Sequence, residues 1–85
     1  MRQLNLSRSA AKSLRRLHGK HARQLAQKLQ SLVADPRPND SKKLVGWAYF
    51  RVDVGEYRIV YMFDATVIDV LLVERRDRVY RILDR

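Results

Sequence analysis

The two-residue stretch Gly55-Glu56, set between two alternating runs of apolar and polar residues, constrains the fold more than any other feature. A type II′ hairpin turn needs a positive φ at its first central position, and glycine adopts that conformation without steric cost. A turn here pairs Val54 with Tyr57 and Asp53 with Arg58, and strand alternation then assigns each neighbour to a face. The turn therefore predicts the register of a hairpin and the composition of its two faces.

The predicted register divides the side chains of the hairpin into an apolar set and a mixed set. The apolar set comprises Ala48, Phe50, Val52, Val54, Tyr57, Ile59, Tyr61 and Phe63, and we expect helices to cover it. The mixed set comprises Trp47, Tyr49, Arg51, Asp53, Arg58, Val60 and Met62, and we expect it on an open face. Asp69 in the next strand must avoid the core, which places Val67, Leu71 and Val73 on the open face too. Arg58 is thus expected on the exposed side of the sheet.

The periodicity of the whole chain predicts an α+β fold in the order β-α-α-β-β-β, with a helical hairpin packed on one face of a mainly antiparallel sheet. Residues 2–7 predict a first strand, and Ser7 or Ser9 can cap the helix that follows. Two helical stretches, 9–19 and 20–36, form the hairpin, and Pro36 ends the second one. The inner face of the second helix comprises Ala22, Leu25, Ala26, Leu29, Leu32 and Val33. Three strands follow at 47–54, 57–63 and 67–74, and the tail fits either a strand extension or a short helix.

Length and composition exclude several classes of protein. Eighty-five residues predict a single domain, 1–85, with one modest core. The chain has no cysteine and only two histidines, so we expect no disulfide, no metal site and no cofactor. No apolar run reaches the roughly 18 residues of a membrane span, and the N-terminus lacks the apolar segment of a signal peptide. We expect a soluble cytoplasmic protein with no membrane association.

The positive charge is concentrated in the first part of the chain. Of a formal net charge of +9, residues 1–34 contribute eight basic residues and no acidic one, whereas residues 35–85 hold ten basic and nine acidic residues. The predicted helical hairpin carries Arg8, Lys12, Arg15, Arg16, Lys20, Arg23 and Lys28. Charge this one-sided favours a polyanionic partner, either nucleic acid or an acidic protein, over a surface that is merely solvated.

The predicted open face combines guanidinium groups with aromatic rings. Arginine binds phosphate oxygens in two-pronged fashion, and aromatic rings stack on unpaired bases, so this combination suits RNA. The alternative is a partly hydrated sheet face with ordinary cross-strand ion pairs, such as Asp53 with Arg58.

The segment "YFRVDVGEYRIVYMFD", followed by "LLVERRDRVYRIL", resembles the signature of RelE/ParE-type toxins of bacterial and archaeal type II toxin–antitoxin modules. That signature has a basic-x-basic strand, then V-G-D/E-Y-R-h-h-Y, then a strand ending in V-x-H-R-R-x-V-Y. The similarity covers nearly the whole chain and implies a strand, a two-helix hairpin and a three-stranded meander. RelE-like members cut mRNA in the ribosomal A site, where a 2′-hydroxyl attacks the adjacent phosphate. ParE-like members instead poison DNA gyrase, and a small antitoxin neutralises both.

The resemblance implies roles for four residues. Arg58 corresponds to the strand arginine that holds the scissile phosphate, and Arg51 to the first basic residue of the basic-x-basic strand. Arg76 corresponds to an arginine that stabilises the transition state or acts as an acid. Tyr80 corresponds to the tyrosine that stacks on or orients a nucleotide.

Two departures from the signature matter. Asp53 stands where a second basic residue is usual, and Arg75 stands where histidine is frequent. Both are candidate catalytic residues, and Arg75, like Arg51, Arg58 and Arg76, can supply a cation to the site. His18 and His21 both lie in the predicted helical hairpin and not in the candidate site. Asp53 is either a general base or a cross-strand ion pair, and we favour the ion pair because a carboxylate between arginines is a weak base.

The resemblance favours a ribosome-dependent mRNA interferase, which is a metal-independent endoribonuclease. Its expected partners are a cognate antitoxin, the ribosome and mRNA, with the basic helical hairpin docking on ribosomal RNA. Two alternatives remain open, a ParE-like gyrase inhibitor and a catalytically weak homologue that binds only the antitoxin.

Overall fold

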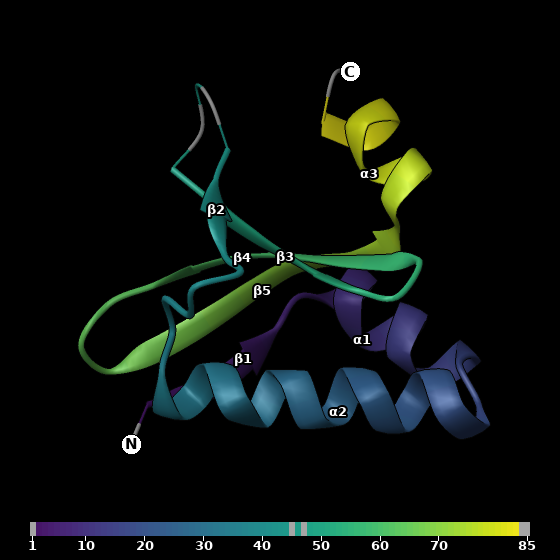
Figure 1. Cartoon of the computed structure of the whole chain (residues 1–85), viewed down its shortest axis with the longest axis horizontal. Helices are drawn as coiled ribbons and strands as arrows, with labels where there is room; N and C mark the ends of the chain where they lie inside the picture. The colour runs from purple at the N-terminus through teal and green to yellow at the C-terminus, as the bar shows by residue number, and fades with distance from the viewer. Residues whose placement is uncertain (1, 45, 47, 84–85) are drawn as a thin grey trace.

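The computed structural model describes residues 2–44, 46 and 48–83, with the backbone alone for Tyr80, Arg81 and Leu83. The elements follow in the order β1 (Gln3–Leu6), α1 (Arg8–Arg16), α2 (Gly19–Ala34), β2 (Lys42–Lys43), β3 (Phe50–Val54), β4 (Tyr57–Phe63), β5 (Val67–Arg75) and α3 (Arg76–Leu83) (Figure 1). The predicted α+β class and the order of helical hairpin and strand meander are confirmed. Within these ranges, no helix has the length and apolar character to cross a membrane.

The strands form one mixed sheet in the order β1-β5-β4-β3-β2. Strand β1 runs parallel to β5, and the other pairs are antiparallel. The hairpin register is the predicted one, since Val54 pairs with Tyr57, Asp53 with Arg58 and Phe50 with Tyr61. Gly55 has a φ of 59°, which is the conformation that the turn requires of its first central residue.

Helices α1 and α2 lie together under one face of the sheet (Figure 1). Helix α1 begins at the cap residue Ser7, whose hydroxyl accepts a hydrogen bond of 3.0 Å from the backbone N–H of Ala10. Helix α2 ends at Ala34, before Pro36, as expected. The core of this face comprises Ala10, Leu25, Leu29, Leu32, Val52, Ile59, Tyr61, Ile68, Val70 and Val73. The expected inward position of Ala26 is wrong, because Ala26 is exposed.

The second face of the sheet, which carries Arg51, Asp53 and Arg58, is less open than the sequence predicts. The tail forms helix α3, which rises over this face with the segment around β2 opposite it (Figure 1). A second, smaller core forms there from Leu44, Val60, Leu72 and Val79, with Tyr49, Leu71 and Ile82 packed against it. Burial of this apolar group provides the tertiary contacts that hold the short helix on the sheet.

A register shift corrects one predicted side-chain position. Val60 pairs with Leu72, whereas the next residue, Tyr61, pairs with Val70, so β5 has one extra residue at Leu71. Such a bulge reverses the alternation beyond it. Val73, which we expected on the open face, therefore faces the helices and is 1% exposed.

Candidate functional site

Asp53 and Arg58 form a two-pronged ion pair across the β3–β4 hairpin. The Nε of Arg58 donates to Oδ1 of Asp53 at 2.6 Å, and its Nη2 donates to Oδ2 at 3.1 Å. The turn at Gly55 places the two residues directly opposite each other, so the contact follows from the register. Arg58 lies on the predicted face, but the expectation that it is exposed is wrong, because only 6% of the residue is accessible.

Two further arginines approach the same carboxylate. Nη1 of Arg51, from β3, lies 3.6 Å from Oδ2 of Asp53, and Nη1 of Arg76, from α3, lies at the same distance. A backbone hydrogen bond of 2.9 Å from the N–H of Arg76 to the carbonyl of Glu56 fixes the start of α3 beside the hairpin turn. Three elements thus bring Arg51, Arg58 and Arg76 together around Asp53, and we call these three side chains the arginine cluster.

The arginine cluster determines the protonation state of Asp53. The hydrogen bonds from Arg58 lower the pKa of the Asp53 carboxyl below its usual value, against a smaller opposing effect of burial. The charges of Arg51 and Arg76 lower it further. Asp53 is therefore an anion at neutral pH and a weak proton acceptor, and this geometry favours an ion pair over a general base.

A pocket of about 450 Å³ opens beside the arginine cluster. It is lined by Glu56, Arg58, Arg75, Arg76 and Asp77. Three guanidinium groups and two carboxylates line it, and its volume is ample for a phosphate group. Sequence reasoning missed Glu56 and Asp77, since their place at this pocket depends on the helical fold of the tail.

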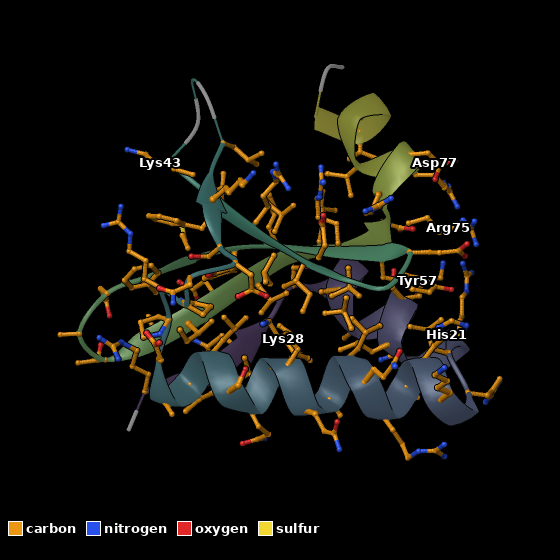
Figure 2. The ribbon with its side chains drawn as sticks, viewed as in Figure 1. His21, Lys28, Lys43, Tyr57, Arg75 and Asp77 are labelled. Carbon is orange, nitrogen blue, oxygen red and sulfur yellow. The ribbon has the colours of Figure 1, made fainter. Side chains whose placement is uncertain are left out.

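Arg75 lines the same pocket as Arg58 and Arg76, but its guanidinium group pairs with carboxylates other than that of Asp53. Its guanidinium group lies 3.4 Å from Glu56 and 3.9 Å from Asp77. Figure 2 shows Arg75, Tyr57 and His21 in succession along one side of the molecule. The rings of His21 and Tyr57 meet edge to face at 5.3 Å.

Two residues of interest lie outside what the structure describes. Tyr80, an expected nucleotide-binding residue, belongs to the backbone of α3, but its side chain is not among the described groups. Trp47, expected on the second face, also lies outside the described residues.

The basic residues of the helical hairpin fall into two groups. Six of them are exposed, and within the described part of the chain no carboxylate pairs with any of them: Arg8, Lys12, Arg15, Arg16, Lys20 and Arg23. Lys28 differs, because its Nζ lies 2.6 Å from Oδ2 of Asp40 and its side chain is 22% exposed. Lys28 projects from α2 toward the sheet (Figure 2), so it is the least available of the predicted RNA-binding residues.

The family model described as "ParE toxin of type II toxin-antitoxin system, parDE" matches residues 4–80. Comparison with curated protein sequences gives no match.

Solved structures of RelE toxins share the fold along nearly their whole length. RelE in the archaeal RelE–RelB complex from Pyrococcus horikoshii is 26% identical, with a TM-score of 0.78 over 91% of this chain and 97% of that one. The intact E. coli RelBE complex contains a chain that is 28% identical, with a TM-score of 0.76 over 88% of this chain and 96% of that one. Isolated E. coli RelE is 27% identical, with a TM-score of 0.76 over 99% of this chain and 96% of that one.

The ion pair predicts a pH-dependent stability difference. Replacing Asp53 with Asn should lower the free energy of unfolding at pH 7 by about 1 to 3 kcal/mol, because the buried Arg58 loses a charged partner. A carboxyl whose folded pKa is depressed stabilises the fold fully above its unfolded pKa of about 3.9. That stabilisation disappears as the pH falls through the pKa of Asp53 in the folded protein. The difference in free energy of unfolding between the parent and Asp53→Asn should therefore vanish in acid.

Urea unfolding between pH 2 and 7 measures this difference, with Asp40→Asn as the matched control. Asp40 forms an equally short ion pair, but its side chain is 53% exposed, so its loss should cost at most about 1 kcal/mol. An Asp53→Asn variant as stable as the parent at pH 7 would show that the pair does not stabilise the fold.

Proposed function

The chain belongs to the ParE toxin family of type II toxin–antitoxin systems, and we propose, from its site and its similarity to RelE structures, that it is a toxin that cuts mRNA on the ribosome. The observation that carries the proposal is the convergence of Arg51, Arg58 and Arg76 from three elements on one point beside an open pocket. Clustered guanidinium groups bind phosphate and stabilise the charge that develops during its transfer. The similarity to RelE structures at 26–28% identity supports the same choice.

The proposed reaction is an internal transesterification of RNA. A 2′-oxygen attacks the adjacent phosphorus while the bond from phosphorus to the 5′-oxygen breaks, which leaves a 2′,3′-cyclic phosphate and a 5′-hydroxyl end. The 2′-hydroxyl loses its proton to a base, and the departing 5′-oxygen gains one. Arg58 would hold the scissile phosphate, and Arg51 and Arg76 would share the additional negative charge of the pentavalent transition state.

The arginine cluster supplies charge stabilisation and little proton transfer. Arginine stays protonated at neutral pH, and the pKa of Asp53 is lowered chiefly by its hydrogen bonds with Arg58. Proton transfer would then fall to groups of the ribosome or to solvent. The need for proton-transfer groups from outside the protein supports a nuclease that works on ribosome-bound mRNA over one that works on free RNA.

The exposed cations of the helical hairpin would provide docking. Arg8, Lys12, Arg15, Arg16, Lys20 and Arg23 lie on α1 and α2, which cover the face of the sheet opposite the arginine cluster (Figure 1). A ligand that contacts both sets must surround the molecule, as a large phosphate-lined RNA cavity does.

A cognate antitoxin is the second proposed partner. The similar RelE chains from Pyrococcus horikoshii and E. coli were solved in complexes with RelB. An acidic segment of an antitoxin would complement the positive charge of residues 1–34.

The family match favours one further candidate, inhibition of DNA gyrase. The matching family description names the ParE toxin of parDE. The resemblance described from the sequence implies that ParE-like members poison gyrase and lack the nuclease residues. A gyrase inhibitor has no need of a phosphate-binding cluster beside a pocket, so the site geometry favours the nuclease.

Induction of the toxin without its antitoxin separates the two functions. We expect incorporation of amino acids to fall before incorporation of thymidine. The 5′ ends of a translated mRNA should map within codons at the A site. Replication that stops first, with gyrase–DNA adducts and intact mRNA, would establish the gyrase function instead.

A triple substitution tests docking through the helical hairpin. Replacing Arg15, Arg16 and Arg23 with Ala removes three exposed cations, so ribosome affinity should fall and depend less steeply on salt. The slope of log affinity against log salt should decrease by roughly 0.7 to 0.9 for each lost phosphate contact. Lys28→Ala is the control, because Lys28 is already paired with Asp40. An unchanged slope in the triple variant would show that these cations do not touch RNA.

Arg76→Ala is the most direct test of the chemistry. The Arg76 side chain is 55% exposed, so its removal should leave the fold intact while single-turnover cleavage on programmed ribosomes falls about 10²- to 10³-fold. Arg78→Ala is the matched control, since Arg78 is 61% exposed on the same helix and pairs with Glu74. Arg58→Ala is less informative, because Arg58 is buried and its removal also destabilises the hairpin. Equal activity of Arg76→Ala and Arg78→Ala would remove Arg76 from the catalytic set.

A further inference from the structure

The arginine cluster already holds an anion, and that anion belongs to the protein. Asp53 receives two hydrogen bonds from the fork of Arg58, at 2.6 Å and 3.1 Å. An arginine fork makes the same two-pronged contact with a phosphate group. Arg51 and Arg76 approach Oδ2 of the same carboxylate at 3.6 Å, which completes an arrangement of three cations around one anion.

We propose that the carboxylate of Asp53 is an intramolecular competitor for phosphate, so that it sets how tightly the arginine cluster binds a phosphodiester. A phosphate group that takes the fork of Arg58 must displace Asp53, because the same two N–H groups cannot serve both anions fully. The identity of the ligand as RNA rests on the proposed function, whereas competition between the two anions does not.

The surroundings of Asp53 leave room for both anions. The pocket of about 450 Å³ gives access to Arg58 and Arg76 from one side. Asp53 itself lines a separate hollow of about 380 Å³ toward α2, together with Gln24, Gln27, Lys28, Ser31, Val54 and Gly55. Its side chain is 31% exposed, so the displaced carboxylate can remain hydrated and avoids the cost of burial without a partner.

The distances indicate which arginine contacts with Asp53 break first when phosphate binds. Arg51 and Arg76 are both beyond hydrogen-bond distance of Asp53. The Arg76 side chain is also largely exposed, so it can turn to an incoming phosphate at little cost. The short contact with Arg58 is the one that opposes binding. A purely structural ion pair would stabilise the hairpin without affecting anion affinity, and that difference can be measured.

Titration with inorganic phosphate tests the proposal without any cleavage assay. The chemical shifts of the purified protein report the dissociation constant, with total ionic strength held constant by chloride. Asp53→Asn keeps the shape of the side chain and removes its charge, so it should bind phosphate about tenfold more tightly than the parent, or about 1.4 kcal/mol. Asp40→Asn removes the same charge from the pair with Lys28 and should leave the constant unchanged.

A measurement on the parent protein covers the case in which Asp53→Asn fails to fold. Saturating phosphate should shift the Nε–H resonance of Arg58 and the carboxyl carbon resonance of Asp53 along one binding curve. The proposal is overturned if phosphate leaves both resonances unmoved, if Asp53→Asn and the parent bind equally, or if Asp40→Asn gains as much as Asp53→Asn. The proposed nuclease function stands or falls separately, because it is judged by cleavage and not by phosphate affinity.

Discussion

The ion pair between Asp53 and Arg58 is the interaction on which the arrangement of the site depends. The turn at Gly55 places the two residues opposite each other, and the contact at 2.6 Å then holds a guanidinium group that is almost fully buried. Without a partner, a buried charge of this kind is strongly destabilising. The pair therefore allows a charged group to lie beneath α3, where Arg76 can reach the same carboxylate.

Helix α3 is the element that turns a sheet face into a site, and it is also the element that the sequence specifies least. Eight residues rich in charge have little tendency to form a helix alone. The helix forms because Val79 and Ile82 pack on Leu72 and on Val60, which is distant in the sequence. The start of this helix separates two neighbouring arginines, since Arg76 turns toward Asp53 and Arg75 toward Glu56. Local pattern cannot predict such a divergence, whereas the resemblance to the family assigns a role to Arg76.

What the sequence predicts well follows from local rules. Alternation on each side of one glycine turn gives the register of the hairpin and the face on which Arg51, Asp53 and Arg58 lie. It fails for Val73, because a bulge shifts the alternation and nothing in the residues themselves marks the extra position. The lack of carboxylate partners for the hairpin cations within residues 1–34 follows from the absence of acids there. The pairing of Lys28 does not follow from it, since its partner Asp40 comes from the loop beyond the helix.

On the proposed function, affinity for RNA and cleavage of RNA depend on two different groups of basic residues. On the proposed function, the unpaired cations of α1 and α2 supply attraction for RNA that does not depend on sequence. The arginine cluster contributes less, because Asp53 neutralises part of its charge in the free protein. Docking through the hairpin would raise the effective concentration of phosphodiester at the cluster, and that increase is what lets the substrate displace an attached carboxylate. A free phosphodiester lacks this advantage, so competition by Asp53 would confine the reaction to RNA that the hairpin has already bound.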